Sequence, residues 1–207
     1  MDQIRNKFIL FCKTPSDINE HLPTLYHYAK ECESVFETGV RGVISSYALI
    51  YGLLNNKSNQ KRILMNDINE CNIDELLSYT KNLNINLTYK WRNNLELEFN
   101  DRYDLTFIDT WHVYGQLKRE LDKFSKITNK YIIMHDTTVD ATYGETYRCR
   151  DILDPIKQSK ESGIPIHEIL KGLWPAIEEF LENNNEWKLK KRYTNNNGLT
   201  ILEKVIL

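Results

Sequence analysis

Residues 104–136, DLTFIDTWHVYGQLKRELDKFSKITNKYIIMHD, decide the fold that this sequence predicts. They begin with a compact apolar strand that closes on Asp109, continue into a helix over 113–124, and end with a continuous apolar strand over 130–136. A strand that is apolar at every position is buried on both faces of a sheet. Two such strands joined by a helix pair in parallel through a right-handed crossover. The stretch therefore predicts one unit of an α/β protein with a parallel sheet.

The same alternation of strand and helix continues on both sides of this unit. Further strands are expected at 34–37, 61–65 and 87–91, and further helices at 17–32, 44–54, 72–81 and 166–181. The helix over 17–32 is predicted from Asp17 and Glu20, which have the three-residue spacing of a capping box.

The last two β-rich runs, 186–193 and 199–206, break the alternation. The segment TNNNG (194–198) that joins them is too short for a crossover helix, so they must pair antiparallel. Asn-Gly supplies the positive φ that such a hairpin needs. The predicted fold is a Rossmann-like three-layer α/β/α sandwich in a single domain over 1–207, with seven strands, six parallel and one reversed.

Composition excludes several classes of function. The 207 residues carry 27 basic and 29 acidic side chains and are 41% hydrophobic, so the chain is typical of a globular protein. A formal net charge of −2 provides no field that would attract nucleic acid or an anionic membrane. No apolar run approaches the roughly 18 residues of a membrane span, and four scattered cysteines indicate reduced thiols. We expect a cytoplasmic protein without nucleic-acid or membrane partners.

Polar side chains follow the predicted strands at the edge where ligands bind in open parallel sheets. They are ETG at 37–39, ND at 66–67, RN at 92–93, DTWH at 109–112 and HD at 135–136. Acids and histidines at one edge exceed what solvation of the chain ends requires, so we expect a ligand site there.

The first turn, ETGVRG (37–42), indicates the kind of ligand. Its glycines allow close approach of backbone, but the G-x-G-x-x-G spacing that cradles a pyrophosphate is missing. The acid Glu37 would repel phosphate and suits a cationic ligand, and Asp67 stands where a ribose diol is commonly held. The pattern favours S-adenosylmethionine (SAM) and disfavours a nicotinamide-dependent oxidoreductase.

At this point the sequence resembles the class I SAM-dependent methyltransferases of the small "methyltransferase domain 24" type, over nearly its whole length. The stretches that carry the resemblance are DINEHLPTLY (17–26), ETGVRG (37–42) with Ser45, FIDTWHVY (107–114), QLKREL (116–121), YIIMHDT (131–137), GLWPAI (172–177) and NNNGLT (195–200).

The resemblance implies roles for individual residues. The methionine end of the cofactor would be lined by Glu37, Gly39, Arg41 and Ser45, the ribose by Asp67, the adenine neighbourhood by Asn93, and the methyl-transfer centre by Asp109 and His112. In related metal-dependent O-methyltransferases, acids after the fourth and fifth strands hold Mg²⁺, and Asp109 and Asp136 match those places. The third ligand position carries Thr137.

Methyl transfer needs an acceptor oxygen held in line and a group that removes its proton, which suits a histidine near neutral pH. His135 is the first candidate for that base, with Asp136 or Asp109 orienting it, and His112 is the second. The alternative is that His135 only makes a structural hydrogen bond at a strand end.

The long segment 137–175 falls where this fold covers its substrate. Its aromatic and charged side chains suit a hydroxylated acceptor such as a sugar or nucleotide-sugar: Tyr143, Glu145, Tyr147, Arg148 and Arg150. The predicted function is SAM-dependent O-methylation of such an acceptor. The alternative is a binding or scaffold protein with a decayed cofactor turn, and a homodimer through the N-terminal helix or the hairpin edge is compatible with either.

Overall fold

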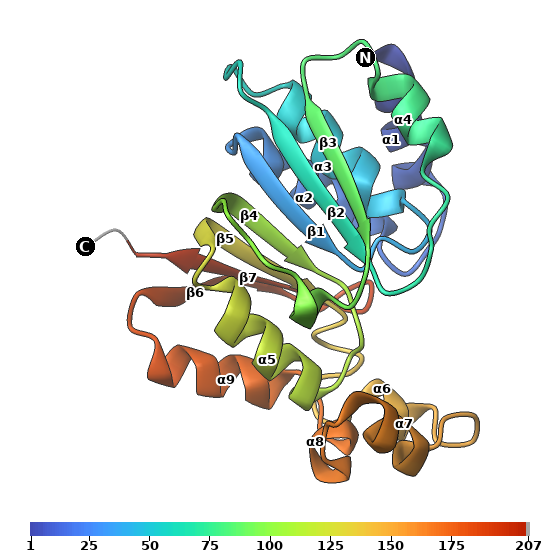
Figure 1. Ribbon diagram of the computed structural model, residues 1–207, viewed down its shortest axis with the longest axis vertical. Coiled ribbons are helices and arrows are strands. Elements are labelled where there is room, and N and C mark those ends of the chain that lie inside the picture. The colour runs from blue at the N-terminus through green and yellow to red at the C-terminus, as the bar shows by residue number, and fades with distance from the viewer. Residues whose placement is uncertain (206–207) are drawn as a thin grey trace.

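A single seven-stranded sheet with helices on both faces organises the computed structural model, which describes residues 1–205 (Figure 1). The strands are β1 (Ser34–Thr38), β2 (Arg62–Asp67), β3 (Asn86–Trp91), β4 (Tyr103–Ile108), β5 (Thr128–His135), β6 (Trp187–Tyr193) and β7 (Leu199–Lys204). The helices are α1 (Asp2–Lys13), α2 (Leu22–Lys30), α3 (Ile44–Leu54), α4 (Asp74–Thr80), α5 (Tyr114–Phe124), α6 (Glu145–Arg148), α7 (Pro155–Ser162), α8 (Ile166–Leu170) and α9 (Trp174–Asn183), with 3-10 turns η1 (Asn19–His21) and η2 (Asn94–Glu96).

The strand order is β3-β2-β1-β4-β5-β7-β6, and β7 alone is reversed, because it pairs antiparallel with both β5 and β6. The predicted sheet of six parallel strands and one reversed strand is therefore confirmed. Asn196, Asn197 and Gly198 all have positive φ, which explains why Asn and Gly fill the hairpin loop. The last predicted strand was expected to reach Ile206, which lies outside the described residues.

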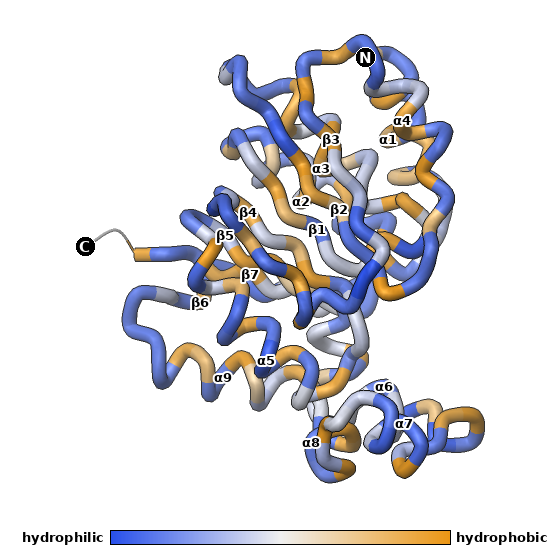
Figure 2. Tube along the Cα trace, in the orientation of Figure 1, coloured by the Kyte–Doolittle hydropathy of each residue, from blue (hydrophilic) through white to orange (hydrophobic). Residues whose placement is uncertain are grey.

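Successive strand residues divide between two cores, because side chains alternate across a sheet. Val35 packs in the core beneath α1, α2 and α3, whereas Phe36 packs in the core beneath α5 and α9. Figure 2 shows apolar residues along the inner strands and interrupted apolar stripes on the helices. Burial on both faces leaves the ends of the strands as the place where polar side chains gather.

The N-terminal region differs from the prediction of one helix over 17–32. Residues 2–13 form α1, which was not predicted, and the next α-helix begins only at Leu22, with Pro23 in its first turn. Asp17 does not cap a helix, because its carboxylate pairs with Arg41. The backbone N–H of Glu20 donates to the Asn196 side chain of the distant hairpin loop. The Asp17 carboxylate and the Glu20 N–H, which a local capping box would use, are thus bonded to residues distant in the sequence.

The segment 137–175 forms α6, α7 and α8, which stand together at one end of the molecule, apart from the strands (Figure 1). The helix predicted over 166–181 is two helices, α8 and α9, and Pro175 lies in the first turn of α9. Proline is tolerated there because the first turn has no intrahelical partner for its missing N–H.

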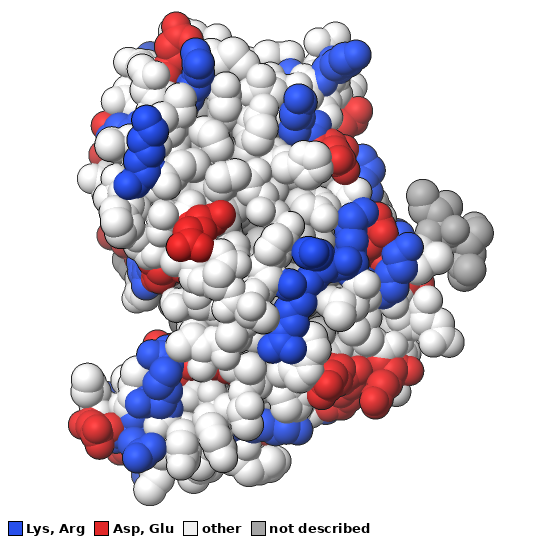
Figure 3. All heavy atoms as spheres, turned by 180° about the vertical axis from the view of Figure 1, so that it is seen from behind, with Lys and Arg blue, Asp and Glu red and all other residues white. Residues whose placement is uncertain are grey.

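The edge strand β6 carries Lys188, Lys190, Lys191 and Arg192. Figure 3, drawn from behind, shows basic side chains in a band at this side of the molecule, close to acidic ones. Lys188 and Lys190 pair with Glu203, so the positive charge is partly compensated. Lysines on an edge discourage pairing with another strand. The homodimer through this edge stays a prediction.

None of the helices within residues 1–205 is long and apolar enough to cross a membrane. All four cysteines are free thiols.

A matched pair of leucines tests the core. Leu121 on α5 is fully buried, whereas Leu77 on α4 is 41% exposed. We expect Leu121→Ala to lower the free energy of unfolding by about 2–5 kcal/mol, because it leaves a cavity, and Leu77→Ala to lower it by less than about 1 kcal/mol. Urea denaturation of both variants measures the difference, and equal losses would contradict this packing.

Candidate functional site

A cavity of about 870 Å³ opens at the carboxyl ends of β1, β2 and β4. Most of the residues singled out from the sequence line it: Gly39, Arg41, Ser45, Asp67, Asn93, Asp109, His112 and Asp136. Two do not, Glu37 and His135. The strand-end pattern therefore located the site, and the fold decides which side chains face it.

The turn after β1 forms one wall, and it requires glycine at position 39. Gly39 has φ +89°, and a Cβ built there would lie 1.9 Å from the carbonyl oxygen of Asp109. Its N–H donates to the Asn66 carbonyl, while the Asp109 N–H donates to the Thr38 carbonyl. These contacts tie the first turn to the ends of β2 and β4. Val43, which ends the turn at φ +64°, is a β-branched residue in a conformation that such residues rarely adopt.

Glu37 lies behind this turn, fully buried, and does not face the cavity. Its two carboxylate oxygens accept hydrogen bonds from the hydroxyls of Ser45 (2.6 Å) and Ser46 (2.7 Å). Burial raises the pKa of Glu37 to about 7, although these two hydrogen bonds oppose the shift. The carboxylate thus holds the start of α3 against β1.

Asp67, at the end of β2, lines the cavity with its carboxylate already oriented. Its Oδ2 accepts from the Arg41 N–H at 2.9 Å, and its Oδ1 accepts from the Asn69 N–H at 2.8 Å. Each oxygen keeps a further lone pair, so the carboxylate can accept two hydrogen bonds from a diol. Asn93 also lines the cavity, and its side chain accepts from the Leu95 N–H at the start of η2.

Residues 17–18, which follow α1, lie against the edge of the cavity beside the first turn. Ile18 lines the cavity, and the Asp17 carboxylate lies 2.5 Å from the Arg41 guanidinium. The Arg41 side chain is 77% exposed, so its role here is contact with this segment at the surface. The Asp17–Arg41 pair was not predictable from the sequence, because the two residues lie in separate segments that only the fold brings together.

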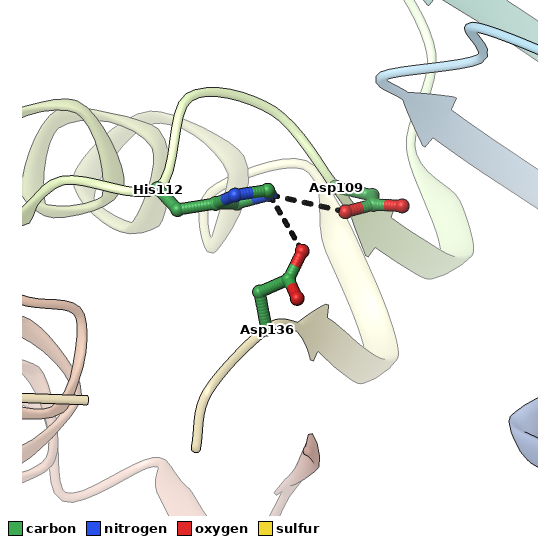
Figure 4. Close-up of side chains that lie close together, drawn as sticks. All are labelled: Asp109, His112 and Asp136. Carbon is green, nitrogen blue, oxygen red and sulfur yellow. Dashed lines mark hydrogen bonds and ion pairs between the residues drawn. The ribbon is translucent and has the colours of Figure 1, made fainter. Parts of the chain in front are cut away.

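Asp109, His112 and Asp136, which all line the cavity, point toward one another (Figure 4). The His112 Nε2 lies 3.2 Å from Asp109 and 3.0 Å from Asp136. Its Nδ1 has no hydrogen-bond partner within residues 1–205, although the carboxylates of Asp140 and Glu145 lie 3.5 and 3.6 Å away. Burial lowers the pKa of His112, but the Asp109 hydrogen bond and the surrounding acids outweigh it and raise the pKa to about 9. His112 is therefore positively charged at neutral pH.

His135 lies behind the two carboxylates rather than in the cavity wall. Its Nδ1 is 3.3 Å from both Asp109 and Asp136, and its Nε2 is 3.3 Å from the Asn196 carbonyl oxygen. Burial opposes charge on His135, but the two acids raise its pKa to about 10. The imidazolium donates from both nitrogens and fixes the two carboxylates.

The same cluster offers donor atoms for a divalent cation. One atom each from Asp109, His112 and Asp136 lie within 4.8 Å of one another. Mg²⁺ prefers oxygen donors, whereas a mixed set of carboxylates and imidazole suits Mn²⁺ or Zn²⁺. Thr137, at the third ligand position of the resemblance, is fully buried and its hydroxyl accepts from Thr200. The residues present therefore fit Mg²⁺ less well than a first-row transition metal.

The segment 137–175 contributes to the cavity through different residues from those predicted. Of the aromatic and charged side chains named from the sequence, only Glu145 lines the cavity; Tyr143 and Tyr147 stack on each other at 4.6 Å outside it. Sequence reasoning missed Gln158 and Glu161 on α7, which do line it. Their three-residue spacing places them on one face of that helix, a signal visible in the sequence.

Other lining residues were not singled out from the sequence, because they come from separate elements: Asn94, Gln116 and Arg119. Thr110 and Trp111, which also line the cavity, lie within the predicted strand-end stretch DTWH. Gln116 and Arg119 on α5 sit between the buried positions of its apolar stripe, so the helix contributes to the core and to the cavity.

No protein-family model matches the sequence, and no curated protein matches it either. Solved structures do resemble the fold. They include an O-methyltransferase from Bacillus cereus in complex with S-adenosylhomocysteine (SAH; TM-score 0.61, 14% identity, 99% of this chain and 91% of that chain). They also include the O-methyltransferase TomG from Streptomyces achromogenes with SAM (0.59, 12%, 99% and 87%) and the N-methyltransferase NodS from Bradyrhizobium japonicum with SAH (0.58, 12%, 99% and 98%).

The chain has the Rossmann-like class I methyltransferase fold. The likeness extends over nearly the whole chain and nearly the whole of each neighbour. At 12–14% identity it shows the fold.

The buried Glu37 predicts a distinctive dependence of stability on pH. Its pKa is about 7 when folded and 4.5 ordinarily, so as pH rises through this window the unfolded chain releases a proton that the folded chain keeps. Stability therefore falls with rising pH. We expect Glu37→Gln to remove this slope, so that the variant gains on the order of 3 kcal/mol over the wild type between pH 4.5 and 8.

Urea denaturation at pH 5 and pH 8 measures this difference. Glu182→Gln, which changes an exposed carboxylate on α9, is the control and should follow the wild type. Parallel pH profiles for Glu37→Gln and the wild type would show that Glu37 is not buried as described.

Proposed function

We propose that the protein is a SAM-dependent methyltransferase that acts on a hydroxyl group of a small acceptor. The observation that carries this proposal is the joint geometry of the first turn and Asp67. Gly39 leaves room for a ligand against backbone, and Asp67 offers two oriented acceptor atoms beside it. The neighbours of the same fold that hold SAM or SAH support the choice of ligand.

The cavity residues fit SAM, which supplies a methyl group already activated by its sulfonium. Asp67 would accept hydrogen bonds from the two ribose hydroxyls, and the turn around Gly39 and Ser45 would hold the methionine portion. Because Glu37 lies behind this turn, it would act by fixing Ser45 rather than by contact with the cofactor.

The Asp109–His112–Asp136 cluster would hold the acceptor. A hydroxyl that donates to either carboxylate would be held at this cluster, and its proton would pass to that carboxylate as the oxygen takes the methyl group. The C–S bond of the sulfonium would break in the same step, and SAH would leave. His135 would keep both carboxylates in place from behind, as a positioning residue instead of the base that the sequence suggested. If a divalent cation binds, Asp109, His112 and Asp136 would hold it, and it would polarise the acceptor oxygen.

The charges of the cavity favour an uncharged, sugar-like acceptor over a nucleotide-sugar. Seven carboxylates line the cavity, against two arginines and His112. This excess of acid would repel the phosphates of a nucleotide and suits the cationic sulfonium. Glu145, Gln158 and Glu161 would pair with acceptor hydroxyls from the α6–α7 side.

Isothermal titration with SAH tests the cofactor assignment before any acceptor is known. We expect micromolar binding to the wild type and at least about tenfold weaker binding to Asp67→Asn, because the amide loses an acceptor for the ribose diol. Glu70→Gln, another carboxylate on the cavity wall, is the matched control and should bind nearly as the wild type. Absence of heat with correctly folded protein would contradict the proposal.

Catalysis and scaffolding can be separated once SAH binds. With methyl-labelled SAM and a panel of neutral sugars and polyols, we expect label to transfer to an acceptor. Asp136→Asn should lower that transfer by about a hundredfold or more while leaving the Kd for SAH nearly unchanged, because this residue faces the acceptor. A binding or scaffold protein would hold SAH and transfer no label.

A further inference from the structure

A buried carboxylate outside the residues discussed so far lies beneath one end of the cavity. Glu120 on α5 is fully buried and does not line the cavity. Its Oε1 accepts from the Thr110 hydroxyl (2.6 Å), the Asn94 amide (2.5 Å) and the Gln116 amide (2.9 Å). All three of these partners do line the cavity. The Oε2 of Glu120 has no hydrogen-bond partner among the described residues.

Burial raises the pKa of Glu120, but a proton on this carboxyl would sit on Oε2, because Oε1 already accepts from three groups. The Oε1 atom is therefore only an acceptor, and it dictates how its three partners are oriented. Gln116 must turn its Nε2 toward Glu120, and the same Nε2 lies 3.2 Å from the Asn94 Oδ1. The Gln116 carbonyl oxygen therefore points elsewhere, and no residue in 1–205 donates a hydrogen bond to it. The Thr110 hydroxyl spends its only proton on Glu120 and keeps lone pairs for the cavity.

Hydrogen bonds from Asn66 and Thr38 fix the orientation of the Asn94 amide from the side opposite Glu120. Asn66 donates its amide to the Lys90 and Arg92 carbonyl oxygens, which leaves its own carbonyl to accept from Thr38. The Thr38 hydroxyl in turn accepts from Asn94, at 3.0 Å. Both protons of the Asn94 amide are thus used, one on Thr38 and one on Glu120. This chain of hydrogen bonds has acceptors at both of its ends, the Lys90 and Arg92 carbonyl oxygens and the Glu120 carboxylate. The amides of Asn66 and Asn94 therefore have only one orientation that satisfies it.

The consequence is an end of the cavity that offers hydrogen-bond acceptors and no free donor from these side chains. It lies next to Asp67 along the wall, because the Arg92 N–H donates to the Asp67 carbonyl and Asn93 and Asn94 follow directly. A ligand whose ribose is held at Asp67 would bring its base to this place. The base that complements acceptors is one with an exocyclic amino group.

We propose that Glu120 is a positioning residue that makes this end of the cavity select adenine. It would do so by orienting Gln116 and Thr110 so that their side-chain oxygens accept a hydrogen bond from the amino group of the base. The inference rests on the proposed function, since it assumes that the nucleoside of SAM occupies the cavity. If the inference holds, the protein discriminates against the inosine analogue of the cofactor. In that analogue a carbonyl oxygen replaces the amino group and would face the acceptor oxygens of Gln116 and Thr110.

The test compares the Kd values of SAH and S-inosylhomocysteine by isothermal titration. We expect the wild type to bind SAH at least about tenfold more tightly, because an acceptor facing acceptors is left unpaired. Glu120→Gln can donate as well as accept, so its partners are free to turn over. This variant should reduce the ratio of the two Kd values at least about threefold.

Two further variants make the outcome decisive. Gln116→Met keeps the shape of a half-exposed side chain, removes the carbonyl acceptor, and should also reduce the ratio even if Glu120→Gln fails to fold. Glu179→Gln on α9, whose carboxylate pairs with Lys118 away from the cavity, should keep the wild-type ratio. A purely structural role for Glu120 would weaken both ligands equally and leave the ratio unchanged.

A wild-type ratio near one, or a ratio that survives both Glu120→Gln and Gln116→Met, would overturn the inference while SAH binding still supported the proposed function. If neither nucleoside binds to folded protein, the proposed function and the inference fail together. The two failures are therefore distinguishable in one set of titrations.

Discussion

The close approach of Gly39 to the backbone of Asp109 is the constraint on which the site depends. A Cβ at position 39 would overlap the Asp109 carbonyl oxygen, so the first turn can reach β4 only as glycine. The first turn is also bonded to Asp67, because the Arg41 N–H donates to the Asp67 carboxylate. The turn therefore lies between Asp67 and Asp109, and both of these residues line the cavity. The wall that carries Asp67 and the acid–histidine cluster are thus two parts of one backbone arrangement.

The carboxylates in and around the site have two kinds of hydrogen-bond partner, histidine rings and serine hydroxyls. Asp109 and Asp136 are held by His112 and His135, whose pKa values these acids raise. Glu37 is instead held by two hydroxyls, and its pKa is raised by burial. A carboxylate beside imidazolium stays ionised and can orient a ligand, whereas one beside hydroxyls serves packing. Identical chemical groups therefore take different tasks according to what surrounds them.

Much of the site could be predicted from the sequence, because strand ends on one edge bring their following residues together whatever the details of packing. The ordering of Glu37, Asp67, Asn93, Asp109 and Asp136 along the chain was enough to locate the cavity. The direction of each side chain was not predictable in this way. Glu37 and His135 precede the turns that face the cavity and point inward, and Glu120, four residues beyond Gln116 on α5, gives no sign in the sequence that it meets Asn94.

The sequence by itself determined the sheet, its parallel order and its reversed final strand, since apolar strands, crossover helices and a five-residue hairpin loop allow few arrangements. Only the tertiary structure decided that Asp17 pairs with Arg41 instead of capping a helix, that residues 2–13 form α1, and which polar side chains share the cavity. The physical reason is the distance along the chain over which each kind of interaction acts. Periodicity and turn chemistry act between near neighbours in the chain, whereas hydrogen bonds and burial in the site join residues that the fold alone brings together.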